Sequence, residues 1–552
     1  MPVSSRFKKA PELKLRLLIS IYRFLPVLLL FLGLAGCLKP GGWPVDQAEY
    51  DKRFPQDDYL SLQVPAELKP EQAQAPSFKV NEKGQTLLSL EQAAYAALRG
   101  NQELTVRQFA PVQAGAFEKI ERGVFSPELF ADFSYGLEKA DKFKTSSRTW
   151  KNEETTETLA TAGVRRRFAS GTNVEISAEG DRTSSSLDPD ESEARLGLSI
   201  TQSLLRGLGP VVNLVAVRQA ELKTRASLYE LRGFTEATLA QAEIAYWEFV
   251  QAEREIAIFK RSLEVAQQQL LEIEQRIEVG MLPQVEAAAA RAEVARREQA
   301  TIEAESNLED RRLRLLRIIN PGGGLGLKLV STSRPDLTPR SIKDIKARAA
   351  LARKSRPDLN EARLRLKENR LQTIATKNGL LPRLDLFVSL GKTGYAQSLS
   401  NSFSDLDGSN YDAVAGVKLS HYLDNLSAEG RHTAALASAR QARAALDNLN
   451  QQVELDVRLA LNQVERARRQ IFATRLTREL QEKTVFAEIE RFDVGKSTSL
   501  LVAQAQRDLL ASQINEVQAI VYYRIGLVRL YLAEGSLLQR RGVSVAAKPS
   551  LW

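Results

Sequence analysis

The sequence is poor in the residues that carry most catalytic and metal chemistry. Among its 552 residues there are one cysteine, two histidines and two methionines, and aromatic residues make up only 7%. A single cysteine excludes an internal disulfide bond. No His, Cys, Asp and Glu residues have the spacing of a metal site, no nucleophile is accompanied by a base, and no glycine-rich loop suits a phosphate. The sequence therefore predicts a protein that is not an enzyme and that holds no cofactor and no metal.

Charge is plentiful but is not concentrated anywhere. Charged residues make up 26% of the chain, and the net charge of +9 is spread over mixed Glu/Arg helical faces without a basic stripe. Nucleic acid is therefore not expected as a partner. His421 follows an alternating segment and His432 lies near the start of a helical pattern, so each is interpreted as a structural or solvated residue.

The only cysteine lies at the end of an N-terminal export pattern. Basic residues precede an apolar run from Phe24 to Leu34, and Leu34-Ala35-Gly36-Cys37 follows. This layout is typical of a bacterial export signal. The last four residues resemble a lipobox, which implies a signal peptide over 1–36, lipidation of Cys37 and, with Leu38 next, sorting to the outer membrane. An ordinary signal peptide with an incidental cysteine is the alternative. The segment 37–86 is rich in Pro, Gln, Asp and Lys and is expected to be an extended, lipid-anchored tether.

Two glycine-containing turns, each between two helical patterns, organise the rest of the chain. Before Gly280 and before Gly495, apolar residues recur three and four positions apart over a long stretch, as in a coiled-coil seam. A glycine after the last periodic residue can take the left-handed conformation that ends a helix. Pro283 suits the start of the next helix after the first turn, and Ser497 or Thr498 suits it after the second. Both stretches are therefore predicted to be tight turns of helical hairpins, and their duplication distinguishes them from ordinary helix ends.

Alternating segments predict strands in both halves. In the first half, the segment 125–135 and then Leu196, Leu198 and Ile200 show this pattern; in the second half it recurs at 384–390 and 413–419. One apolar and one polar face suits a half-buried strand of a soluble sheet as well as a strand between lipid and water. The export signal and the absence of a later apolar span favour the membrane, because only helices and closed barrels satisfy backbone groups in lipid.

The stretch between the two strands of the first half holds an insertion. A polar segment with Trp150 is expected to be a loop, and residues from about Thr158 to Ala178 form a hairpin-like stretch around Ser170-Gly171-Thr172-Asn173. The second half has no counterpart of this hairpin.

The two halves otherwise repeat one order of elements. A capping box at Ser89–Gln92 begins a helical pattern that continues to about Arg122. Strands, a long helix from after Pro210 to Val279, the turn and a shorter helix follow. That long helix would span on the order of 100 Å, so it must pack lengthwise against its neighbours. Two strands per half, plus the insert, are too few to close a barrel, so several chains must contribute.

Taken in order, these features resemble the outer membrane efflux protein family, the TolC-like channels. The resemblance covers Leu87 to about Leu538. It is carried by the order and duplication of short motifs: Leu88-Ser89-Leu90-Glu91-Gln92-Ala93, Gln202-Ser203-Leu204-Leu205-Arg206-Gly207, Arg356-Pro357-Asp358-Leu359, Leu380-Leu381-Pro382-Arg383-Leu384 and the two Val-Gly turns. It implies a first repeat over 87–320, an equatorial linker over 321–340, a second repeat over 341–538 and a tail over 539–552.

The family implies an α+β fold of mostly long α-helices. Three chains would form an α-helical barrel, the periplasmic tunnel, joined to a shared transmembrane antiparallel β-barrel to which each chain gives four strands. The function implied is that of an outer membrane channel in a tripartite efflux or type I secretion system, which conducts substrate passively. The partners implied are two further copies in a homotrimer, a periplasmic adaptor, an inner-membrane pump and outer membrane lipid.

The resemblance also assigns residues to the far end of the tunnel. The turns Val279-Gly280-Met281 and Val494-Gly495-Lys496 would form the periplasmic tip where the adaptor docks. Residues near the tip are candidates for a pore constriction: Glu286, Asp493, Gln504 and Asp508.

Two other classes remain open from the sequence. A periplasmic adaptor is also often a lipoprotein with a long helical hairpin, but it would show one hairpin between compact β-domains. A coiled-coil structural lipoprotein would have no use for the alternating strands.

Overall fold

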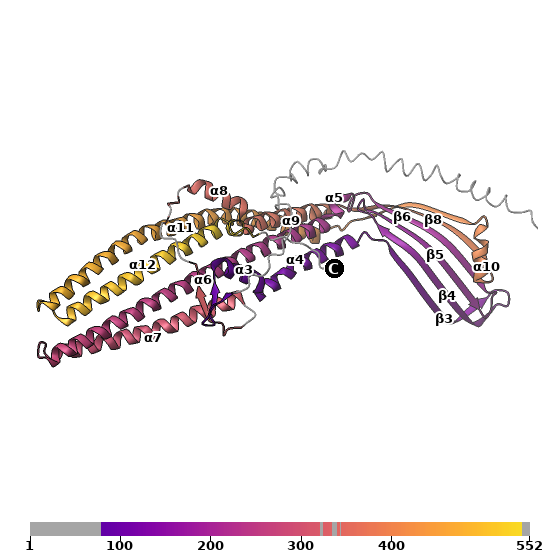
Figure 1. The fold of residues 1–552 in the computed structure, drawn as a ribbon. Coiled ribbons are helices and arrows are strands. Elements are labelled where there is room, and N and C mark those ends of the chain that lie inside the picture. The colour runs from indigo at the N-terminus through magenta and orange to yellow at the C-terminus, as the bar shows by residue number, and fades with distance from the viewer. Residues whose placement is uncertain (1–78, 321–323, 334–338, 340, 343, 544–552) are drawn as a thin grey trace, which may run out of the picture. The chain divides into compact units, whose positions relative to one another are not determined.

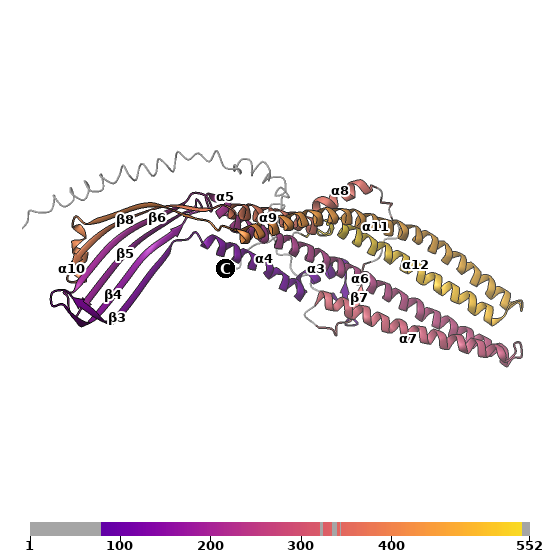
Figure 2. The ribbon, with the colours of Figure 1, turned by 180° about the vertical axis from the view of Figure 1, so that it is seen from behind.

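The computed structural model describes residues 79–320, 324–333, 339, 341, 342 and 344–543. All of them belong to the compact unit Leu68–Trp552. The signal peptide 1–36, Cys37 and the tether as far as residue 78 lie outside the described residues. Figures 1 and 2 show a large sheet at one end of the described part and two helical turns at the other.

Helices, some long and some short, make up most of the described chain. Their bounds are α3 Leu90–Gly100, α4 Gln102–Gly123, α5 Pro210–Asn213, α6 Val215–Glu278, α7 Val285–Ile319, α8 Ile345–Ser355, α9 Pro357–Gly379, α10 Leu399–Ser404, α11 Leu426–Asp493, α12 Ser499–Ala533 and α13 Leu537–Arg540. The long helix predicted to end at Val279 is present as α6, and both predicted turns lie between helices. The capping box is also present, since the Gln92 amide donates to Ser89 Oγ and the Ser89 amide donates to Gln92 Oε1. No described helix is long and apolar enough to cross a membrane.

The first helical pattern is split where one helix was expected. Asn101 has an extended backbone, and its side chain accepts a hydrogen bond from the Leu104 amide at 3.0 Å. This side chain caps α4, so the run predicted from Ser89 to Arg122 becomes two helices, because an asparagine competes well with the helical backbone for its own amides.

Helices pack lengthwise in two sets. The long helix α6 contacts α3, α4 and α7, and the long helix α11 contacts α8, α9 and α12; α6 also contacts α9 and α12. The apolar seams predicted from sequence are buried at Ile256, Ala266 and Ile273 in α6 and at Val453, Val457, Val464 and Ile471 in α11. Each long helix therefore lies beside shorter ones that together match its length, as the length argument requires.

One antiparallel sheet holds all the long strands. Its order is β3-β4-β5-β6-β8-β9, with β3 Glu128–Lys144, β4 Thr149–Arg167, β5 Thr172–Ser185, β6 Glu191–Ser203, β8 Arg383–Ala396 and β9 Tyr411–Ser420. The expected inserted hairpin is present as β4 and β5. It does not stand apart, however: it lies inside the sheet between β3 and β6. The four expected strands are β3, β6, β8 and β9, and the hairpin, whose place the sequence left open, brings the number in this sheet to six.

The segment around Trp150 is strand and not loop. Residues 145–148 make a short turn, and β4 begins at Thr149. Trp150 lies opposite Phe143, and the two rings meet edge to face with centroids 5.5 Å apart. A cross-strand aromatic pair of this kind stabilises a hairpin whose polar composition otherwise favours a loop.

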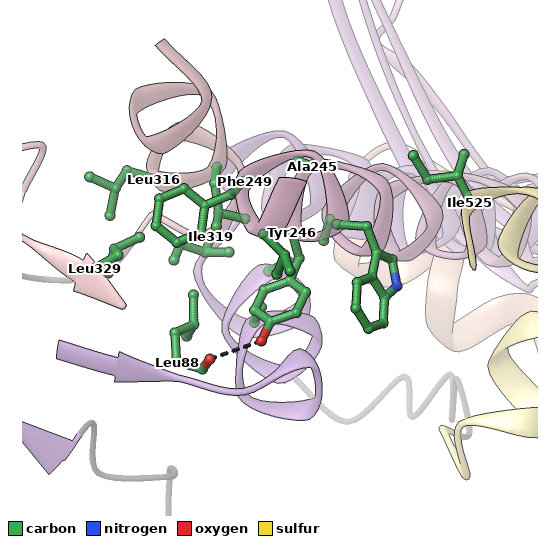
Figure 3. Packing of buried hydrophobic residues seen from close by; sticks show 14 of the residues in the cluster. Leu88, Ala245, Tyr246, Phe249, Leu316, Ile319, Leu329 and Ile525 are labelled. Atoms are coloured by element: carbon green, nitrogen blue, oxygen red, sulfur yellow. Dashed lines mark hydrogen bonds between the residues drawn. The ribbon is translucent and has the colours of Figure 1, made fainter. Parts of the chain in front are cut away.

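A second, small sheet lies against the helices. It joins β1 Lys79–Val80, β2 Thr86–Leu88 and β7 Leu329–Ser331, with β2 and β7 parallel. The sequence predicted an extended tether as far as residue 86, but Lys79 and Val80 pair with Leu87 and Thr86 in this sheet, and residues 81–85 form the turn between them. The largest core cluster lies beneath it, where the buried hydroxyl of Tyr246 on α6 donates to the Leu88 carbonyl at 3.0 Å (Figure 3).

Candidate functional site

Both predicted turns have the geometry of a helix that ends at a glycine. Gly280 has φ +73° and Gly495 has φ +74°, in the left-handed region. The amide after each glycine donates back to the helix at 2.8 Å, from Met281 to the Arg276 carbonyl and from Lys496 to the Arg491 carbonyl. These are Schellman-type ends that satisfy carbonyls left free by the helix.

The two turns contact each other although they are far apart in sequence. Arg276, at the end of α6, places Nη2 2.7 Å from Asp493 Oδ1, at the end of α11. The guanidinium of Arg276 also lies over the Phe492 ring, 5.5 Å from its centroid. On the other side of the turns, Glu286 accepts hydrogen bonds from the Ser499 amide and hydroxyl. The two hairpin ends therefore form one surface.

The candidate tip residues form the exposed part of this surface. Val279, Met281 and Val494 keep 67%, 77% and 66% of their surface exposed, and Gly280, Gly495 and Lys496 are exposed as well. Apolar residues this exposed contribute little to packing among the described residues.

The four candidate constriction residues separate into two groups. Asp493 and Glu286 lie at the turns and take part in the contacts between the hairpins. Gln504 and Asp508 lie further along α12 and are exposed. The sequence did not indicate Arg276 and Ser499 as the partners at the turns, because no local pattern marks residues that meet across more than 200 positions.

A buried charged cluster lies between α7 and α12 and was also not foreseen. Glu293 Oε1 is 2.7 Å from Arg297 Nη2, and Glu293 Oε2 is 3.3 Å from Arg507 Nη1. Burial lowers the pKa of Arg297, and the nearby carboxylate of Glu293 opposes this shift. The sequence signal was a charged pair four positions apart on a helix, which alone is usually solvated.

A carboxyl pair lies between α6 and α9. Arg365 Nη2 is 2.9 Å from Glu230 Oε1 and 2.5 Å from Glu361 Oε1. Burial raises the pKa of Glu361 to about 7, with a further contribution from the neighbouring Glu230, while Arg365 opposes the shift. This contact is therefore sensitive to proton concentration near neutral pH.

One face of the large sheet is mostly apolar, and the other is more polar. Registered neighbours on one face include Leu129, Val164, Ile176, Leu198, Leu390 and Ala413. On the other face, one position along, lie Glu128, Arg165, Glu175, Ser199, Ser389 and Val414. In β3, the segment Leu129–Leu137 places apolar residues at every second position and has about the 9–11 residues that a tilted strand needs to cross a bilayer.

The two outer strands of this sheet are unpaired along one edge each among the described residues. These are β3 and β9. Their apolar side chains stay exposed, at 73% for Phe133, 60% for Val417 and 68% for Leu419. An exposed, long, apolar edge strand is a template for pairing with another strand.

The helices next to those edges also expose apolar side chains. The helix α4 leads into β3 and exposes Val106, Phe109, Phe117 and Ile120; α11 follows β9 and exposes Leu455, Leu459, Leu476 and Leu480. Phe109 and Phe117 are 58% and 64% exposed in the single chain. Rows of exposed apolar side chains are typical of protein contact surfaces.

Neither histidine takes part in a catalytic arrangement. His432 Nδ1 lies 3.1 Å from the Thr376 hydroxyl, and His421 is exposed after the end of β9. Within the described ranges, no group of three or more His, Cys, Asp or Glu side chains is placed to hold a metal ion.

Comparisons with known proteins agree with this architecture. The family model of the outer membrane efflux protein matches residues 166–321 and 349–536. The outer membrane efflux protein BepC of Brucella suis is 27% identical over 330 residues, which cover 59% of this chain and 68% of that protein.

Solved structures with the same fold include two outer membrane channels. OprN has a TM-score of 0.62 and 19% identity over 81% of this chain and 90% of that one. CmeC of Campylobacter jejuni has a TM-score of 0.62 and 17% identity over 81% of this chain and 85% of that one. Since the family model covers more than half of the sequence in two segments, the chain belongs to the outer membrane efflux protein family and is an outer membrane channel protein of efflux systems.

Proposed function

We propose that three copies of this chain form a continuous passive channel from the periplasm through the outer membrane. The channel would receive its substrate from an inner-membrane pump through a periplasmic adaptor, in a tripartite efflux or type I secretion system. The observation that carries this proposal is the two-faced sheet with two unpaired edges, because such a sheet is incomplete within one chain.

The sheet supplies the membrane part of the channel. Its apolar face suits lipid, and its polar face, with Glu128, Glu175 and Asp412, suits water. Six strands do not close, since about eight are needed for a barrel whose interior is only filled by side chains. Pairing of β3 of one copy with β9 of the next closes the wall and leaves no free backbone edge in lipid.

The helices support the same arrangement of copies. Because α4 continues into β3 and α11 follows β9, one neighbouring copy would cover an exposed sheet edge and an exposed helical stripe together. The exposed sheet edges and the exposed helical stripes thus favour the same neighbouring copy. The resulting ring of helices, in which α6 alone spans on the order of 96 Å, would form the periplasmic tunnel.

The exposed turns at the other end would dock the adaptor. Val279, Gly280, Met281, Val494, Gly495 and Lys496 form the tip, and the contact between Arg276 and Asp493 keeps the two hairpins together. Glu286, Asp493, Gln504 and Asp508 would line the narrowest part of the pore. A channel of this kind conducts solutes down a gradient, and the pump supplies the energy.

The N-terminal residues would add a membrane anchor. Lipidation of Cys37 would attach the chain to the outer membrane, each buried methylene contributing ~0.8 kcal/mol to membrane binding. The two halves, 87–320 and 341–538, are proposed to be repeats, since each gives helix, strand, strand, long helix, turn and helix in this order.

Assembly and conduction can be tested with one pair of variants. The wild-type protein from outer membranes should run as an oligomer that heat dissociates and should produce single-channel currents in planar bilayers. Phe117→Glu, in the exposed stripe of α4, should abolish both, whereas Lys119→Glu, exposed on the same helix but off the stripe, should retain both. Because Phe117 is exposed in the single chain, its loss should not unfold the subunit. A wild-type protein that stays monomeric and conducts nothing in bilayers refutes the proposal.

A further inference from the structure

The hairpin β4–β5 is built into the sheet along its whole length. The register of β4 against β3 runs without a break from Arg165 opposite Glu128 to Thr149 opposite Lys144. The register of β5 against β6 runs from Thr172 opposite Gln202 to Thr183 opposite Glu191. If the hairpin left the sheet plane, β3 and β6 would each lose a partner strand.

Both faces of the hairpin continue the pattern of the strands beside it. Val164 and Ile176 extend the apolar row between Leu129 and Leu198, while Glu175 and Ser177 extend the polar face. Ile176 is 59% exposed although it is apolar, so it packs against little within its own chain. This alternation is what a wall between lipid and water requires of each strand.

A helix from the second half fixes the hairpin in this position. The short helix α10 contacts β5, β6 and β8 together. At Gly180 of β5, an added Cβ atom would lie 2.9 Å from Leu399 Cδ1 of α10, so the Leu399 side chain packs closely over this strand. The hairpin is therefore held from both halves of the chain.

From these contacts we infer that β4 and β5 are wall strands of the membrane barrel, so that each copy contributes six strands. The inference rests on the proposed trimer, in which the barrel then has eighteen strands and not twelve. At its membrane end, the pore of this barrel admits larger solutes than the pore of a barrel without the hairpin.

The wider barrel matches the tunnel that the same three copies form. With strands ~4.8 Å apart and tilted by ~40°, eighteen strands give a radius of about 18 Å, and twelve give about 12 Å. Each copy supplies four columns of helix: the two long helices α6 and α11 and the row of shorter helices beside each. Twelve such columns, ~9.5 Å apart, give a ring of radius about 18 Å. With the hairpin in the wall, the barrel and the tunnel have about the same radius. With four strands per subunit, the channel would narrow where the helices meet the strands. Since cross-section follows the square of the radius, the membrane pore is about twofold larger in area.

Labelling of introduced cysteines tests whether the hairpin lies in the wall. The trimer is reconstituted in phospholipid vesicles and treated with a maleimide that does not cross membranes. Cysteines on the lipid face, in Ile176→Cys and in its β6 neighbour Leu198→Cys, should not be labelled. Cysteines on the polar face, in Ser177→Cys and Ser199→Cys, should be labelled through the pore. Equal labelling of Ile176→Cys and Ser177→Cys would show that the hairpin stands in water and would overturn the inference.

Electron microscopy of the wild-type oligomer gives the number of barrel strands directly, without any substitution. Eighteen strands around a threefold axis are expected. A trimeric channel with a twelve-strand barrel and the hairpin outside it overturns this inference but leaves the proposed function standing. A protein without a trimer or without bilayer currents overturns the proposed function itself.

Discussion

The C-terminal segment is attached to α6 by a buried ion pair, and its loss should destabilise the fold measurably. Arg541 Nε lies 2.6 Å from Glu243 Oε1, and Nη2 donates to Oε2 at 2.7 Å. Glu243 is completely buried. The Arg541 side chain keeps 35% of its surface exposed, so the pair lies at the border of the core.

The expected magnitude follows from what Arg541→Ala leaves behind. Removing one partner of a buried pair leaves an uncompensated charge, at a typical penalty of 3–5 kcal/mol. Solvent reaches Arg541, so we expect about 3 kcal/mol, the lower end of that range. The neighbouring Arg540 provides a matched control. Its partner Glu534 is also buried but is held by Arg348 as well, so Arg540→Ala should lose about 1 kcal/mol or less.

The assay compares the temperature at which the oligomer dissociates in detergent with limited proteolysis of the C-terminal segment. Arg541→Ala should lower the dissociation temperature and expose the segment after α12 to cleavage, whereas Arg540→Ala should change neither strongly. Replacing both partners, in Glu243→Leu with Arg541→Leu, should be less harmful than Arg541→Ala alone, because no buried charge remains. Equal effects of Arg541→Ala and Arg540→Ala would refute the reasoning.

Three further predictions concern pH, the tip and a turn. Because the pKa of Glu361 is raised to about 7, the stabilisation from its protonation is fully present below about pH 4.5 and is lost as pH rises through 7. Glu361→Gln should therefore stabilise the protein above pH 7, by at most ~3 kcal/mol, and should flatten the pH dependence of unfolding between pH 4.5 and 7. Arg276→Ala should remove the contact with Asp493, which contributes ~0.5 kcal/mol, so that the fraction of chains with separated hairpin ends rises about twofold and mean bilayer conductance increases. Gly495→Ala should lose ~1 kcal/mol locally, because alanine disfavours φ +74°, and should increase hydrogen exchange at the tip.

Each of these predictions has an outcome that contradicts it. A pH dependence unchanged by Glu361→Gln would assign the proton uptake to other groups. Conductance that is the same in Arg276→Ala and wild type would show that the hairpin contact does not restrict the pore. Unaltered exchange in Gly495→Ala would mean that the turn tolerates a side chain at this position.

The helical part of the fold could be predicted from the sequence because its signals are local. The spacing of apolar residues before Gly280 and Gly495 determines which helical face is buried, and a glycine ends each helix whatever surrounds it. The two turns could be located for the same reason. The contact between the turns could not be predicted: Asp493 is a candidate from the sequence, but its partner Arg276 lies 217 positions away and looks like an ordinary solvated charge in its own helix.

The large sheet was predicted less completely from the sequence, because its strands are stabilised by pairing with adjacent strands. The threonine- and glutamate-rich start of β4 has little apolar alternation, and only its pairing with β3 makes it a strand. The hairpin itself was visible in sequence as an insertion. Its place inside the sheet depends on backbone pairing with β3 and β6, which leaves no mark on composition.

Cross-linking between copies tests the central claim most directly. A cysteine at Ala131 on β3 is combined in one chain with a cysteine at Ala413, Ala415 or Val417 on β9, and the protein is oxidised in outer membranes. Where these outer strands pair between neighbours, one combination should yield covalent trimers, and variants with only one of the two introduced cysteines should yield none. If no combination links two chains while the wild-type protein is folded in the membrane, the copies do not complete one another's sheet and the account fails.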